Sequence, residues 1–404
     1  MFGLFDPFTL VTDVSLHEGR SLESLLAPQS LGGGQSIGGA IVEASYVHRD
    51  PPLLARLAES QIAWAVNPQS SRFASARFRN VPTLANLPYA PDSPLDPTRF
   101  DKETREMVRG ALEFQAAHEP SMYVVPALPS SKVSARVFRA FTDLHAFAAD
   151  LNGSAKIPFR PMLAASYPSY AVMRARFGTF DRLDRTFAGA LVQPLQLNTK
   201  QDSVEKLVTY SRFLQTVADG PLPVVACRPG AFGLILAAFG IEIFESSLDG
   251  GGSFSGSRLD REPKPSTDEK RNGGRAKSVY VGALRTALPF DLANEVLTSL
   301  SLAAQLGCLI DECRLGGYPF ALENPRRHFQ HVRQEELRML RALPSPQYRV
   351  PVLVEWLRSS SDLGRAINRI RDEQSKPSIN FGHLDRWVGV VARVGAVSAL
   401  EDQG

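Results

Sequence analysis

Short apolar runs alternate with segments of helical periodicity along most of the chain. Residues 224–227 and 241–244 are two such runs, and the glycine-rich apolar segment between them has the length of one helix. Two parallel strands need a crossover connection, so this stretch predicts a strand, a helix and a second strand. Arg228 and Glu245 follow the two runs, and α/β barrels carry their chemistry at the carboxyl ends of their strands.

Six further apolar runs have the length and composition of strands. They are residues 37–45, 62–66, 122–127, 157–164, 187–192 and 278–284. Eight strands that alternate with helices indicate a (β/α)8 barrel, because each parallel strand needs a crossover and closure removes both edges of the sheet. A doubly wound open sheet is the alternative. No G-x-G-x-x-G motif follows the first strand, which disfavours the dinucleotide-binding version of that alternative.

The patterns divide the chain into three regions. Residues 1–35 have no sustained period and are expected to form an irregular lead-in. Residues 36–286 are expected to form the barrel, with a flexible glycine-rich insertion at 249–277. Residues 287–404 are expected to be a helical C-terminal extension. Its predicted helices span residues 288–306, 325–343, 350–374 and 383–399.

Helices are also predicted between the strands of the barrel region. Residues 101–118 begin with an acidic turn, residues 133–151 have apolar positions at helical spacing, and Asp202 is predicted to cap a helix that ends at Ala218. The segment 70–101 is too rich in proline for regular structure. We expect it to form a lid or binding loop over one face of the barrel.

Composition narrows the class of protein. The 404-residue chain is 44% hydrophobic, which is enough for a large core. No apolar run approaches the roughly 18 residues that span a bilayer, and the first residues lack the order of a signal peptide, so we expect a cytoplasmic protein without membrane contact. A net charge of +3 is too small to indicate nucleic acid by itself. One arginine-rich helix fits either a solvated face or a phosphate-binding surface. Its arginines are Arg326, Arg327, Arg333, Arg338 and Arg341.

Polar side chains stand at the ends of several predicted strands. They are Glu43, Asn67, Gln193, Arg228 and Glu245. In a barrel they would all point to one rim, where a carboxylate acts as nucleophile or base and an amide reads the edge of a heterocycle. Ordinary polar rim residues without a role in chemistry are the alternative.

The three cysteines cannot all pair with one another, so no disulfide framework is expected. Cys308 and Cys313, followed by His328, are chemically adequate ligands for a structural zinc ion. The remaining ligand would come from Asp311, Glu312 or His331. Because a C-x4-C spacing is looser than C-x2-C, buried cysteines without metal are the alternative.

The second of the two central strands carries a family resemblance. Residues 239–247, F-G-I-E-I-F-E-S-S, are similar to the G-[IV]-D-x-F-D-[SC] segment of tRNA-guanine transglycosylases and their DNA-modifying relatives. These enzymes are (β/α)8 barrels that exchange guanine for a 7-deazaguanine base. The resemblance implies that Glu245 is the nucleophile that attacks C1′ of the ribose and that Ser246 binds substrate.

The same family holds a structural zinc ion with a C-x-C-x2-C motif and a downstream histidine. Cys308 and Cys313 match the outer cysteines, Ile310 stands at the middle one, and His328 or His331 matches the histidine. Two acidic positions of the family also differ. Glu245 replaces the nucleophilic Asp, and the segment 67–73 begins with Asn where the D-S-G-G-F motif of the family has Asp.

Three functions are compatible with these features. The first is a transglycosylase-like enzyme on tRNA or DNA, with Glu245 as nucleophile or electrostatic stabiliser of an oxocarbenium-like centre. Asn67 and Gln193 would then read the base, and Arg228 would lie near a phosphate or a base carbonyl. The second is a non-catalytic barrel that binds nucleic acid or protein. The third is a barrel enzyme on a small polar metabolite, with Glu43 and Glu245 as acid and base. The sequence leaves homo-oligomer formation open.

Overall fold

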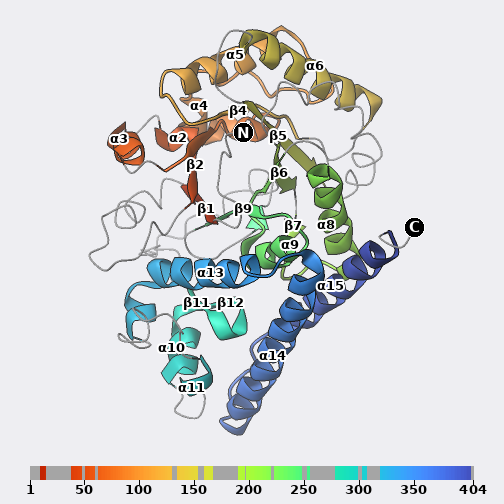
Figure 1. Cartoon of the computed structure of the whole chain (residues 1–404). Coiled ribbons are helices and arrows are strands. Elements are labelled where there is room, and N and C mark those ends of the chain that lie inside the picture. Colours follow the sequence, from red (N-terminus) through yellow and green to blue (C-terminus); the bar gives the residue numbers. More distant parts are fainter. Residues whose placement is uncertain are drawn as a thin grey trace.

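Eight parallel strands form one sheet in the structure, a computed structural model (Figure 1). In sheet order they are β3 (Trp64–Asn67), β2 (Gly39–Glu43), β1 (Leu10–Val14), β9 (Ile243–Ser247), β8 (Val224–Ala226), β6 (Ala190–Leu195), β5 (Phe159–Ser166) and β4 (Tyr123–Val125). The structure describes residues 10–14, 38–47, 51–59, 62–129, 134–152, 159–166, 190–195, 197–219, 223–247, 253–254, 278–298, 303–306 and 319–401. A parallel sheet combined with helices is the α/β class that the sequence predicts.

Strands that follow one another in the chain are neighbours in the sheet. β1 pairs with β2 on one side and with β9 on the other, so the first and the last of the eight strands are adjacent. At the ends of the sheet order, Ala65 of β3 forms a parallel bridge with Met122, the residue before β4. The backbone N–H of Ser121 also donates to the carbonyl oxygen of Trp64 at 2.9 Å. The two outer strands are therefore linked at this bridge.

Two strand predictions were wrong. Leu10–Val14 lies in the expected irregular lead-in, yet it is β1 and pairs on both sides. Pairing with the neighbouring strands stabilises β1, and the local sequence pattern does not indicate this pairing. Residues 278–284, the predicted eighth strand of the barrel, contain β11 (Ser278–Val281), which instead pairs antiparallel with β12 (Thr286–Pro289) in a separate hairpin. The turn closes at Arg285, whose φ of 46° is left-handed.

Helices follow most of the strands. They are α2 (Ala44–Val47), α3 (Pro51–Glu59), α5 (Lys102–Ala116), α6 (Ala135–Asn152), α8 (Val204–Ala218) and α9 (Gly233–Ala238). Asp101 caps α5, since its side chain accepts a hydrogen bond from the backbone N–H of Thr104 at 3.0 Å. Ser203 caps α8 by accepting from the backbone N–H of Lys206, so the prediction of Asp202 as the cap was wrong by one residue.

The proline-rich segment 70–101 contains short helices, so the prediction that it has no regular structure was wrong. These are η1 (Ser70–Arg72), η2 (Phe78–Asn80) and α4 (Pro82–Ala85), and proline occupies the first turn of α4, where its missing N–H costs nothing. Phe73, Phe78 and Tyr89 are buried and pack edge to face. The segment is therefore anchored by its own aromatic side chains.

The C-terminal region is helical, as predicted. Its helices are α10 (Phe290–Thr298), α11 (Ala303–Leu306), α13 (Pro325–Arg341), α14 (Pro346–Glu373) and α15 (Gly382–Glu401). Figure 1 shows α13 beside α9, and α15 running along both α14 and α8. Within the described ranges, no helix has both the length and the apolar composition that a membrane crossing requires.

The two faces of the sheet contribute to different apolar clusters. Helices cover one face, where Val42 and Val66 belong to one cluster and Val192 and Phe244 to another. The alternate strand positions meet on the other face, which we call the inner face. The inner cluster consists of Ile41, Ala65, Met122, Val124, Ala127, Leu191, Val225, Cys227 and Ile243.

Candidate functional site

The inner face becomes polar at the carboxyl ends of the strands. Successive side chains of a strand alternate between faces, so a residue two positions after an inner apolar residue shares its face. Glu43 follows Ile41 in this way, and Glu245 follows Ile243. Asn67 likewise stands two positions after Ala65, and Gln193 two positions after Leu191. Each of these four polar side chains is at most 9% exposed. With Arg228 they form what we call the strand-end cluster.

Arg228 connects the ends of three strands. It follows β8 with a left-handed φ of 54°, which is uncommon for a residue with a side chain. Its backbone N–H donates to the carbonyl oxygen of Glu245 in β9 at 3.1 Å. Its guanidinium Nη2 donates to Oε1 of Glu43, at the end of β2, at 3.2 Å. The fold thus uses Arg228 to hold the rim of the sheet together.

Glu43 lies between two arginines. Its Oε1 is 3.2 Å from Arg228 and 3.6 Å from Arg72, which η1 supplies, and the Glu43 and Arg228 side chains are largely buried. Glu43 is also the register partner of Asn67 in the neighbouring strand. Its carboxylate is therefore committed to ion pairing with these two guanidinium groups.

The two amides of the cluster differ in their hydrogen bonds. Oδ1 of Asn67 accepts from the backbone N–H of Gln69 at 2.9 Å, and Oε1 of Gln69 accepts from the backbone N–H of Ser45 at 2.9 Å. Asn67 thus orders the turn after β3 through its oxygen. Oε1 of Gln193 is buried and has no hydrogen-bond partner within the described part of the chain. A buried amide oxygen without a donor is costly, which makes it a candidate ligand contact.

The strand-end cluster contains most of the residues that the sequence singled out. Glu43 and Arg228 are in direct contact, and Gln193 sits beside Cys227, whose backbone N–H donates to Val192 at 2.8 Å. Ser246 pairs with Thr12 of β1 in the sheet.

Sequence reasoning missed two charged residues near this rim. Arg72 comes from a segment in which no regular structure was expected. Asp13 belongs to β1, at a register position between Ile41 of β2 and Ser247 of β9. The five residues L-V-T-D-V give no local periodic signal that could have identified this strand and its acidic residue.

Of the candidate zinc ligands, the structure describes only the two histidines, His328 and His331. Cys308 and Cys313 lie outside the described residues, whereas His328 is buried in α13 with Nε2 2.9 Å from the carbonyl oxygen of Tyr280. A carbonyl only accepts, so Nε2 carries the proton, and metal-bound histidines commonly have this contact. Among the residues that the structure describes, no group of three His, Cys, Asp or Glu could hold a metal ion. The zinc ion therefore stays a prediction.

The arginine-rich helix α13 is only partly a solvated face. Arg338 is exposed and pairs with Glu335 at 2.5 Å. Arg333 is fully buried, donates to the hydroxyl of Tyr280 at 3.0 Å and lies 3.3 Å from Glu336. Arg333 therefore belongs neither to a solvated face nor to a phosphate-binding surface, the two alternatives that the sequence offered for these arginines, because it is buried in the interior.

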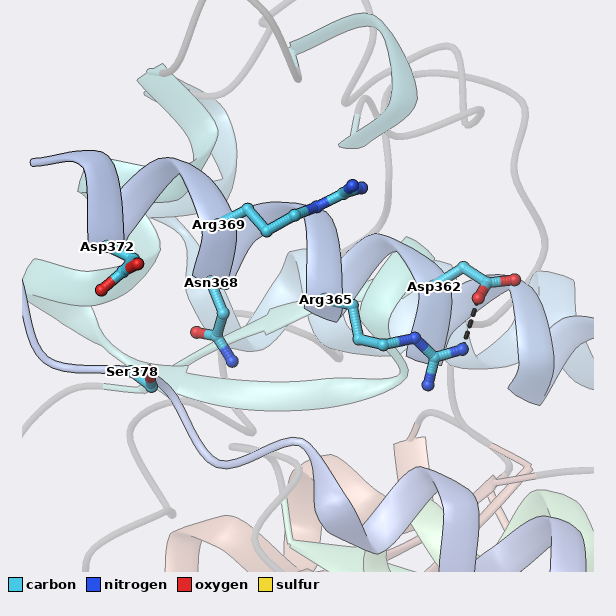
Figure 2. Close-up of a pocket in the computed structure, with 6 residues that line it drawn as sticks. All are labelled: Asp362, Arg365, Asn368, Arg369, Asp372 and Ser378. Atoms are coloured by element: carbon cyan, nitrogen blue, oxygen red, sulfur yellow. Dashed lines mark hydrogen bonds and ion pairs between the residues drawn. The ribbon is translucent and has the colours of Figure 1, made fainter.

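A polar hollow of about 720 Å³ lies along α14, and Figure 2 shows its lining. Its residues are Asp362, Arg365, Asn368, Arg369, Asp372 and Ser378. Arg365 pairs with Asp362, and Asn368 exchanges two hydrogen bonds with the backbone of Ile379 at 2.8 and 2.9 Å. Several polar groups of the hollow are therefore already hydrogen-bonded or ion-paired within the protein. Its acidic and basic side chains are mixed along the lining. The hollow offers no convergent set of groups for a ligand.

Comparison with models of protein families and with the curated proteins gave no match to this sequence. The function is therefore argued from the strand-end cluster.

Proposed function

We propose that the chain is a transglycosylase-type enzyme that exchanges a guanine base of tRNA or DNA for a 7-deazaguanine-type base at the strand-end cluster. The proposal includes closure of the parallel sheet into a (β/α)8 barrel. Two observations support closure, namely a sheet order that follows the chain order and the bridge between Ala65 and Met122 at its two ends. The observation that carries the function is Glu245, a carboxylate 2% exposed on the inner face, within the parallel strand β9.

Glu245 supplies the nucleophile in this proposal. Its carboxylate bonds to C1′ of the nucleoside as the bond from C1′ to the guanine nitrogen breaks, and the departing base takes a proton from water. The incoming base then attacks C1′ through its ring nitrogen, which loses its proton to water, and the bond from C1′ to the carboxylate breaks. A covalent intermediate divides one difficult displacement into two easier ones.

The two amides are suited to reading the base. A guanine edge presents N–H donors next to a carbonyl acceptor. Oε1 of Gln193, which has no hydrogen-bond partner in the described ranges, is an acceptor for such a donor. The Asn67 oxygen is used by the turn, so its NH₂ group is the part that would donate to a base carbonyl.

The ion pairs of Glu43 favour this function over chemistry on a small metabolite. The metabolite hypothesis needs Glu43 and Glu245 as acid and base, but Glu43 contacts both Arg72 and Arg228. A carboxylate that is ion-paired with two guanidinium groups is not available to contact a substrate as acid or base. We assign Glu43 a positioning role.

Trapping of the covalent intermediate tests the proposal. Purified protein is incubated with tRNA or DNA and a 7-deazaguanine base, and complexes that survive denaturing electrophoresis are counted beside incorporated label. We expect Glu245→Gln to lose the trapped complex and to lower exchange by at least about 10³-fold, with nucleic-acid binding retained. Binding without exchange in the wild type would instead identify a non-catalytic module. Unchanged exchange in Glu245→Gln would exclude Glu245 as the nucleophile.

The structural zinc ion remains part of the proposal, with Cys308, Cys313 and His328 as its ligands. Metal content of the purified wild type and of Cys313→Ser tests it directly. Stoichiometric zinc that the variant lacks is the expected result, and a wild type without metal would remove this part of the proposal.

A further inference from the structure

Three basic residues that are distant in sequence meet beside the strand-end cluster. Lys200 lies in the turn between β7 (Leu197–Asn198) and α8, while His383 and Arg386 belong to the first turns of α15. The guanidinium of Arg386 donates to the backbone oxygen of Lys200, and Nε1 of Trp387 donates to the backbone oxygen of Thr199 at 2.7 Å. We call Lys200, His383 and Arg386 the basic cluster.

The charges of the basic cluster have no acidic partner. Nζ of Lys200 donates to the hydroxyl of Thr286 at 2.7 Å and lies 3.4 Å from the carbonyl oxygen of Ala287, and both acceptors are neutral. In the part of the chain that the structure describes, no carboxylate forms an ion pair with any of the three residues. A half-buried cation without a counter-ion is costly, so the fold retains Lys200 and Arg386 at a cost.

The nearby acidic residues are engaged elsewhere. Asp202 pairs with Lys206 at 2.9 Å and accepts from the backbone N–H of Asn198 at 2.7 Å. Asp385 of α15 accepts from the hydroxyl of Ser361 at 2.7 Å and lies 3.7 Å from Arg365. The first turns of α15 thus send their acidic residue toward α14 and their basic residues toward the turn at Lys200.

Buried polar atoms of the cluster also lack hydrogen bonds. His383 is 3% exposed, and neither its Nε2 nor Nε of Arg386 has a hydrogen-bond partner among the described residues. Burial lowers the pKa of Lys200. Burial, with the positive charges of Lys200 and Arg386, lowers the pKa of His383 to about 3. A bound anion would offset the positive charges and offer a hydrogen-bond acceptor to the buried nitrogen atoms.

The basic cluster adjoins the strand-end cluster. The hydroxyl of Thr199, the residue before Lys200, donates to the carbonyl oxygen of Pro229 at 3.4 Å, and Pro229 directly follows Arg228. Phe232, in the short helix η4 (Gly230–Phe232) that follows Pro229, packs edge to face with Trp387 of α15, with ring centroids 5.8 Å apart. A nucleotide whose base occupies the strand-end cluster would therefore have its backbone within reach of the basic cluster.

We infer that the basic cluster binds a phosphate of the nucleic-acid strand whose base is held at the strand-end cluster, an inference that rests on the proposed function. Lys200 contributes a point charge and Arg386 a planar set of donors, a combination suited to phosphate oxygens. The positive end of the α15 dipole lies at the same place and adds to the attraction. The site is independent of base identity, because it contacts only the backbone.

Binding of a fluorescein-labelled RNA stem-loop and of the corresponding DNA, followed by anisotropy over a series of salt concentrations, tests the inference. We expect Lys200→Met to weaken binding about tenfold and to reduce the slope of log affinity against log salt by about one charge. Lys200→Arg keeps the charge and should restore most of the affinity. The matched control is Lys206→Met, which removes the same charge from a lysine already paired with Asp202. Thermal melts establish that each variant is folded.

Pyrophosphate, titrated and observed by phosphorus NMR, separates this inference from the proposed function. Loss of pyrophosphate binding in Lys200→Met, in a protein that exchanges no base, would leave the phosphate site standing and contradict the proposed function. Normal base exchange with RNA affinity unchanged in Lys200→Met would overturn the phosphate site alone. Equal weakening by Lys200→Met and Lys206→Met would also overturn it, because the effect would then be one of net charge.

Discussion

The backbone N–H of Arg228 donates to the carbonyl oxygen of Glu245 at 3.1 Å, so a residue two positions after β8 fixes the backbone of the proposed nucleophile in β9. The same arginine reaches Glu43 at the end of β2 with its guanidinium. Its left-handed φ of 54° is the backbone strain that accompanies this double contact. The position of Glu245 therefore depends on the ion pair between Arg228 and Glu43. Glu43 lies in β2, which is far from Glu245 in the sequence.

Replacement of Glu43 by glutamine should destabilise the protein and misplace Glu245. It leaves Arg72 and Arg228 together without their carboxylate, and loss of one partner from a largely buried ion pair costs about 3 kcal/mol. Urea denaturation measures the free energy of unfolding. Glu106→Gln is the control, since its pair with Lys102 is exposed and should contribute less than about 0.5 kcal/mol. Equal effects of the two variants would contradict the role given to Glu43.

Gln193→Met should stabilise the free protein and weaken ligand binding. The substitution removes a buried oxygen that has no hydrogen-bond donor in the described structure, so we expect the free energy of unfolding to rise by about 1 kcal/mol. Gln115→Met is the matched control. The Gln115 amide exchanges hydrogen bonds with the backbone of Val124 at 2.8 and 2.9 Å, so its loss should destabilise by about 2 kcal/mol. Destabilisation by both variants would show that Gln193 is structural.

The part of the fold that the sequence predicts well is the part with strong local patterns. The unit of β8, α9 and β9 agrees with its apolar runs and glycine-rich connection, and so do the C-terminal helices. The strand β1 was missed because five residues of mixed polarity carry no periodic signal. Its pairing with β2 and β9 depends on residues that are far away in the chain, which a local pattern does not contain.

The residues of the candidate site also divide into those that a local sequence pattern identifies and those that it does not. Glu43, Asn67 and Gln193 are identified from sequence because a polar residue next to the end of an apolar run is a local feature. Arg72 and Lys200 are not, because Arg72 lies in the short helix η1 and Lys200 in a turn, and each acquires its role from a residue of another element. Turns after strands hold functional residues that only the assembled fold brings together.

The free energy of unfolding should decrease as the pH falls, because of His383. The pKa of this histidine is lowered from 6.5 to about 3 by burial, Lys200 and Arg386, so between these values the unfolded chain binds a proton that the folded chain does not. The free energy of unfolding then decreases by up to about 1.4 kcal/mol per pH unit as the pH falls below 6.5. Chemical denaturation from pH 7 to pH 5 measures the slope. We expect a shallower slope in His383→Gln, and a slope equal to that of the wild type would contradict this assignment.

Gly233→Ala should destabilise the unit that carries Arg228 and Glu245. A Cβ at Gly233, the first residue of α9, would lie 2.5 Å from two ring carbons of the buried Phe244 in β9. The helix or the ring must shift, so we expect the free energy of unfolding to fall by about 2 to 3 kcal/mol. Gly395→Ala in α15 is the matched control, because its Cβ would meet Val350 at an ordinary 3.7 Å and should stabilise the helix by about 0.5 to 1 kcal/mol. Because Phe244 immediately precedes Glu245, the Gly233 variant should also lower base exchange more than its stability loss explains at temperatures where it remains folded. Full exchange in a folded Gly233→Ala variant would show that the site tolerates movement of β9.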